Sequence, residues 1–126
     1  MLSVAKGAFE VKLSPEKSDE HIARMAIDKV FKGDLQATSI GQMLSASTEI
    51  EGSAGYVAME RVVGTLHNKH GSFILQHHGI MTRGLPELTI KVVPDSATGD
   101  LVGLSGQMKI TISDGHHSYE FEYEMA

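Results

Sequence analysis

Apolar and polar residues alternate with a period of two along most of the chain. In "SYEFEYEM", for example, Tyr119, Phe121 and Tyr123 alternate with glutamates. Such alternation places successive side chains on opposite faces of a β-strand. No window of eleven or more residues keeps the 3.6-residue apolar spacing of an amphipathic helix. We therefore predict a nearly all-β protein.

Short connections rich in glycine, proline and other turn-forming residues divide this pattern into eight strands. An antiparallel eight-stranded up-and-down β-barrel would pair every strand edge that an open sheet leaves free. A two-sheet sandwich is the alternative fold. Either fold is expected to form one domain over residues 1–126. The predicted strands are Ser3–Leu13, Ile22–Phe31, Leu35–Ala46, Tyr56–Leu66, Ser72–Ile80, Glu87–Val93, Leu104–Ile112 and Ser118–Met125.

The segment "SFILQHHG", residues 72–79, begins as an apolar strand and ends in polar side chains. If Leu66 pairs with Gly71 across a four-residue turn, the register of the hairpin places Glu60 opposite His77. The sequence therefore predicts a carboxylate and an imidazole side by side on one face of the sheet.

The two faces of this hairpin differ in the side chains that they carry. We predict that Phe73, Leu75 and His77 point into the barrel, because this face carries the aromatic ring, and that Gln76 and His78 point outward. The outward face also carries several apolar residues, which favours cover by a second subunit. A homo-oligomer is therefore expected.

The hairpin supplies the candidate site. A buried Glu60 hydrogen-bonded to His77 could move a proton near neutral pH, which suggests acid–base catalysis on a small apolar molecule. In the alternative interpretation the two side chains only satisfy each other's hydrogen-bonding groups at the rim of the barrel. The residues expected to line the ligand cavity are Tyr56, Val62, Phe73, Leu75, Tyr119 and Phe121.

The order of strands in an up-and-down barrel also predicts which polar residues are neighbours. One mouth is expected to collect the residues at the start of the fourth and eighth strands and the end of the fifth. Lys29 is in phase with the core-facing Ile27 and Phe31, where its side chain could form a buried pair, line a cavity or extend past the rim to solvent, and we expect the last of these. The residues expected at that mouth are Tyr56, Glu60, His77, His78, His116, His117 and Tyr119.

Composition narrows the possible functions. The chain has no cysteine, which excludes disulfides, thiolate nucleophiles and cysteine-ligated metal sites. Its net charge of -5, without a basic cluster, argues against nucleic-acid binding. Without an apolar run long enough to cross a bilayer or a signal peptide, a cytoplasmic protein without membrane contact is expected. Adjacent histidines in a strand face opposite ways and cannot both bind one ion, so no metal site is predicted. No cofactor is predicted either.

Several motifs resemble a family of small bacterial proteins known only as a domain of unknown function. They are "ERVVGTL" with "FILQHHG", together with "FKGDLQATS", "GDLVGLSG" and "DGHHSYEFEY", and the resemblance runs from "GAFEVKL" to "YEFEY". That family is similar in fold to allene oxide cyclase, an eight-stranded barrel with an apolar cavity. The resemblance implies a barrel, and it transfers neither substrate nor glutamate role to this chain.

Two functions from different classes follow from these observations. The leading hypothesis is a barrel that binds an apolar or amphipathic small molecule in its lumen, with isomerase or cyclase chemistry through Glu60 and His77. The alternative is a non-enzymatic assembly protein whose filled barrel acts through a subunit or partner interface. An open lumen favours the first hypothesis, and a solid interior favours the second.

Overall fold

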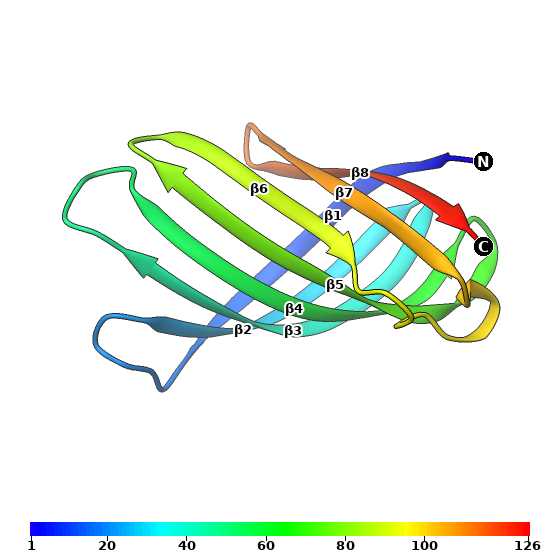
Figure 1. The fold of residues 1–126 in the computed structure, drawn as a ribbon, viewed down its shortest axis with the longest axis horizontal. Helices are drawn as coiled ribbons and strands as arrows, with labels where there is room; N and C mark the ends of the chain where they lie inside the picture. Colours follow the sequence, from blue (N-terminus) through cyan, green and yellow to red (C-terminus); the bar gives the residue numbers. More distant parts are fainter.

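Eight antiparallel strands, each paired with the next, form a barrel that closes where β8 pairs with β1 (Figure 1). The computed structural model describes residues 1–126. It confirms the predicted up-and-down barrel and excludes the sandwich. The strands are β1 (Ser3–Glu16), β2 (Ala23–Gly33), β3 (Leu35–Ser47), β4 (Ala54–Leu66), β5 (Lys69–Thr82), β6 (Leu85–Val92), β7 (Leu104–Ser113) and β8 (His116–Met125).

Side chains fill one half of the barrel. Alternate residues of all eight strands point inward, and large rings such as Phe31, Phe73 and Phe121 are buried there. At this end the hydroxyl group of Tyr119 donates to the carbonyl of Lys32 and accepts from the amide of Leu35, so it anchors the β2–β3 turn. Tyr119 was predicted at the mouth beside Tyr56, and that placement is wrong because the tilt of the strands carries it to the filled end.

The other half of the barrel is open. Inward-facing positions continue there beyond the packed core, yet their apolar side chains are exposed to solvent. Leu88, which lies opposite the buried Gly79, is 44% exposed, and Ile112 is 66% exposed. Figure 1 shows the β3–β4 and β5–β6 hairpins projecting at the end of the barrel opposite the termini. The barrel thus has a solid core at one end and an apolar mouth at the other.

The β4–β5 turn is shorter than the sequence suggested. It contains only His67 and Asn68, whose φ angles of 45° and 68° correspond to the two-residue turn that matches the twist of a hairpin. The register therefore shifts by two residues, so that Leu75 and not His77 lies opposite Glu60. An even shift keeps every side chain on its predicted face, and His77 still points inward.

The long connection between β6 and β7 lies along the edge of β5. Its backbone bonds to β5 through Val93 and Thr98, and it contains the three-residue 3-10 helix η1 (Gly99–Leu101). That turn is the only helix, and no helix of the protein has the length and apolar character to cross a membrane. β6 and β7 themselves share a single register pair, Lys91 with Gln107.

Candidate functional site

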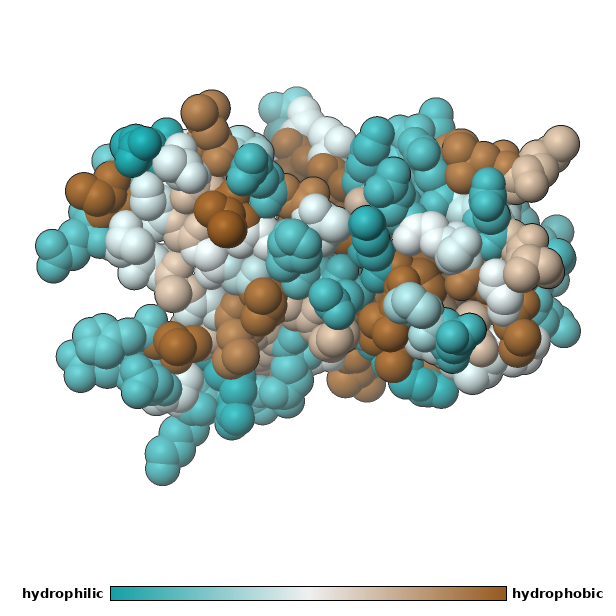
Figure 2. All heavy atoms as spheres, in the orientation of Figure 1, coloured by the Kyte–Doolittle hydropathy of each residue, from teal (hydrophilic) through white to brown (hydrophobic).

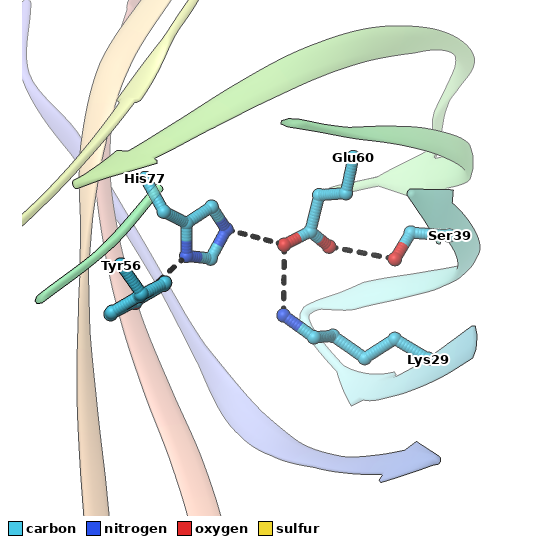
Figure 3. Close-up of polar contacts among 5 residues, drawn as sticks. All are labelled: Lys29, Ser39, Tyr56, Glu60 and His77. Atoms are coloured by element: carbon cyan, nitrogen blue, oxygen red, sulfur yellow. Dashed lines mark hydrogen bonds and ion pairs between the residues drawn. The ribbon is translucent and has the colours of Figure 1, made fainter. Parts of the chain in front are cut away.

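A buried carboxylate lies at the centre of the polar residues inside the barrel (Figure 3). Glu60 of β4 receives His77 Nε2 at 2.5 Å and Lys29 Nζ at 2.8 Å on the same oxygen, Oε2. Ser39 Oγ donates to the other oxygen at 2.7 Å. All four side chains are buried. The carboxylate therefore has a donor on each oxygen and no contact with solvent.

Neighbouring strands bring this network together. Lys29 lies opposite Ser39 across β2 and β3, and Glu60 lies opposite Gly41 across β3 and β4. The glycine is required there, because a Cβ at Gly41 would lie 2.7 Å from the Cα of Glu60 and 2.1 Å from the carbonyl oxygen of Met59. The two backbones therefore approach closely at the point where the carboxylate turns inward.

The charge of Glu60 follows from its surroundings. Burial alone would raise the pKa of this carboxyl, but the hydrogen bond from His77 and the charge of Lys29 together outweigh burial and lower the pKa to about 2. Glu60 is therefore a carboxylate at neutral pH and can only accept hydrogen bonds. Titration near neutrality was predicted for the pair of Glu60 and His77; the carboxyl of Glu60 itself titrates well below neutrality, because the nearby cation and donors stabilise its charged form.

The carboxylate also determines how the imidazole is protonated. Since Glu60 can only accept, His77 Nε2 must carry a proton and donate it. In the neutral ring Nδ1 then accepts from the hydroxyl group of Tyr56, which lies 3.4 Å away. Burial, and after it the negative charge of Glu60, raise the pKa of Tyr56, so this side chain remains a neutral phenol. The result is a chain of donors that runs from Tyr56 through His77 to Glu60.

Lys29 completes the network instead of reaching solvent. Its side chain is buried, and the ammonium lies 5.0 Å from the ring centre of Phe9 and 5.4 Å from that of Phe31. The predicted extension past the rim is wrong, because the carboxylate of Glu60 and the two aromatic faces stabilise the cation inside the barrel. The buried pair of Lys29 and Glu60 carries no net charge.

A hollow of about 330 Å³ lies at the open mouth, between the tips of β3, β4, β5 and β6. Tyr56 is the one member of the polar network that lines it. The ring of Tyr56 rests against Gly79, where a Cβ would lie only 2.6 Å from a ring carbon. The hollow is mainly apolar, and its lining includes Met43, Ala54, Met81, Pro86 and Leu88.

The structure divides the predicted site residues between the two halves of the barrel. Glu60 and His77 form the predicted pair, and Tyr56 contacts it. The other five predicted lining residues are packed in the filled half, and none of them lines the hollow: Val62, Phe73, Leu75, Tyr119 and Phe121. Sequence reasoning missed Met43 and Met81, which the same two-residue alternation places on the inward face nearer the strand ends.

The remaining histidines of the predicted mouth do not join the network. His116 and His78 are exposed, whereas His117 packs against Phe9 with ring centres 5.2 Å apart. No group of three or more His, Cys, Asp or Glu side chains could hold a metal ion. The polar network inside the barrel thus joins Tyr56, His77 and Glu60 with Lys29 and Ser39.

Comparison with known proteins shows which family the sequence of this chain matches. The chain matches a family described as "Protein of unknown function (DUF3224)" over residues 5–123. It is also similar to a crystal structure of a protein with unknown function from the DUF3224 family from Shewanella oneidensis MR-1. The two chains are 48% identical, with a TM-score of 0.97 over 100% of this chain and 98% of that one. No curated protein matches the chain.

Proposed function

Because this chain belongs to the DUF3224 family of proteins of unknown function, we propose a function from its site: it binds an apolar or amphipathic small molecule in the open half of the barrel. One observation carries this proposal. Inward-facing apolar side chains, among them Leu13, Met81, Leu88 and Ile112, are exposed at the mouth. Covering such surface gains about 25 cal/mol per Å², so an apolar ligand is favoured there.

The polar groups of the mouth favour a neutral ligand that carries an oxygen atom. Lys29 is already paired with Glu60, so the network presents no free cation to an anionic group. Tyr56 lines the hollow, and its long contact with His77 leaves its hydroxyl group able to bond a ligand. A hydroxyl or carbonyl oxygen near Tyr56, followed by an apolar body, fits these groups.

The donor chain also supports isomerase or cyclase chemistry as a further hypothesis. The oxygen of Tyr56 would take a proton from a ligand carbon while its own proton passes to His77 Nδ1. The resulting imidazolium would be stabilised by the carboxylate of Glu60, which positions His77 without touching the ligand. Return of the proton to a different carbon would isomerise the ligand with no gain or loss of atoms or electrons.

A second candidate function, assembly through the outer surface, is favoured by a different observation. The outward side chains of β2 to β5 include many exposed apolar residues. Figure 2 shows that apolar groups interrupt the hydrophilic surface of the face in view. An unpartnered apolar surface of this kind suits contact with a second copy of the chain. We define it as the outer patch: Val30, Ile40, Leu44, Val57, Met59, Val63 and Ile80.

One pair of variants separates the two candidates. Leu88→Lys places a charge in the mouth, and Ile40→Lys places the same charge on the outer patch, where Ile40 is 73% exposed. We expect the wild type to bind the neutral dye Nile red with enhanced fluorescence. Leu88→Lys is expected to weaken that binding at least about tenfold, because it leaves a charge beside an apolar ligand.

Light scattering on the same samples reports the second candidate. If the outer patch joins two copies, Ile40→Lys lowers the molar mass while Leu88→Lys leaves it unchanged. Equal dye binding by the wild type and Leu88→Lys would rule out the mouth as the ligand site. A monomeric wild type would rule out self-association through the outer patch.

A further inference from the structure

The wall of the barrel has one weakly joined seam. β6 and β7 share only the pair Lys91 with Gln107, whereas the neighbouring β7–β8 pairing continues to the ends of both strands. Between that pair and the mouth, residues 85–90 of β6 and 108–113 of β7 form no further register pair. The two strands cross the near side of the barrel in Figure 1.

Apolar side chains border this seam on the inside. Continuing the register from Lys91 and Gln107 places Leu88 on the same level as Ile110. Leu88 and Ile112 are both inward-facing and both exposed, at 44% and 66%. Leu88 also lines the mouth hollow, so the hollow and the seam are continuous through one side chain.

We propose that the seam between β6 and β7 is a second part of the binding site, which takes the apolar tail of an elongated neutral amphiphile. This inference rests on the proposed function. The oxygen of the ligand lies at Tyr56, and its hydrocarbon chain leaves the hollow past Leu88 to lie along Ile110 and Ile112. An alkyl chain forms no hydrogen bonds, so it needs no polar partner at the unpaired strand edges. The two edges can separate around the chain, or their backbone groups can stay hydrogen-bonded to water on the outside of the barrel.

The first test uses the wild-type protein with decan-1-ol, a neutral amphiphile with an extended chain. Displacement of Nile red establishes whether the alcohol binds, and amide hydrogen exchange locates it. We expect bound decan-1-ol to slow exchange severalfold at those amides of residues 85–90 and 108–113 that point into the seam, because the tail excludes water from these edges and limits their separation. Unchanged exchange there, despite displacement of the dye, would overturn the tail site.

A matched pair of variants gives the second test. Ile112→Ser removes apolar contact at the seam, and Val102→Ser removes an apolar side chain in the connection that precedes β7, where Val102 is 65% exposed. Each buried methylene contributes about fourfold in affinity. We therefore expect Ile112→Ser to weaken binding of decan-1-ol roughly tenfold and of hexan-1-ol far less, while Val102→Ser changes neither.

The two proposals fail in different ways. If neither Nile red nor either alcohol binds the wild type, the proposed function itself is wrong. If decan-1-ol binds and Ile112→Ser binds it as tightly as the wild type does, only the tail site is wrong. Binding with a loss in Ile112→Ser that is specific to the longer alcohol supports both proposals.

Discussion

Replacing Glu60 by glutamine is expected to lower the free energy of unfolding by about 3–5 kcal/mol at neutral pH. The carboxylate accepts from Lys29, His77 and Ser39 in a fully buried site. A glutamine has one carbonyl oxygen for these donors, and its amide NH₂ group would face the others. The ammonium of Lys29 would then lie inside the barrel without a counter-charge. Urea denaturation measures the loss.

The pH dependence of the unfolding free energy tests whether the carboxylate of Glu60 is the cause of this loss of stability. The pKa of Glu60 in the folded protein is about 2, below its ordinary value of 4.5, so the ionised form stabilises the fold above pH 4.5. This stabilisation, about 3 kcal/mol, is lost as the pH falls from 4.5 towards 2. Glu60→Gln has no such group, and the difference between the two proteins should shrink over the same interval.

Glu122→Gln provides the matched control. Glu122 pairs with Lys109 at 3.9 Å on the outside of the barrel, where the lysine is well exposed. A pair of this kind contributes little, so the change should be within about 0.5 kcal/mol at every pH. A similar small effect for Glu60→Gln would show that the buried network does not stabilise the fold.

Replacing Gly41 by alanine is expected to cost about 3 kcal/mol of stability, although it adds a single methyl group. The added Cβ would lie 2.1 Å from the carbonyl oxygen of Met59 and 2.8 Å from the Cβ of Glu60. Atoms do not approach so closely, so β3 and β4 must separate at the buried carboxylate. As the two strands separate, the contacts of Glu60 with Ser39 and Lys29 should weaken.

Gly55→Ala tests whether the cause is local crowding. Gly55 lies on the same strand as Glu60, and the nearest atom to its added Cβ would be a carbonyl oxygen at 3.8 Å. Its φ angle is not in the left-handed region, so alanine should be neutral or stabilise by up to about 1 kcal/mol. Equal midpoints of thermal unfolding for the two alanine variants would contradict the close approach at Gly41.

Much of the fold could be predicted because the two-residue period is a local property of the sequence. It placed Phe73, Leu75 and His77 on the inner face, and a register error of two residues could not change that face. The error itself came from Gly71, which resembled the end of a turn. In the structure it is a glycine because the carbonyl of Thr98 would lie 2.1 Å from a Cβ there.

The depth of each residue in the barrel was harder to predict. Alternation assigns a side chain to the inside but gives no position along the barrel axis, which depends on strand tilt. Leu75 and Leu88 both point inward, yet the first is packed in the core and the second lines the mouth. The partner of Lys29 was missed for a similar reason, since its contact with Glu60 spans β2 to β4.

A crystal structure of the protein with decan-1-ol tests the central claim most directly. The account predicts the alcohol in the open half of the barrel beside Met43, Met81 and Leu88. Its oxygen should lie within hydrogen-bonding distance of the hydroxyl group of Tyr56, above an unchanged pair of His77 and Glu60. A mouth closed by the protein's own side chains, or alcohol bound only at the outer patch, would contradict it.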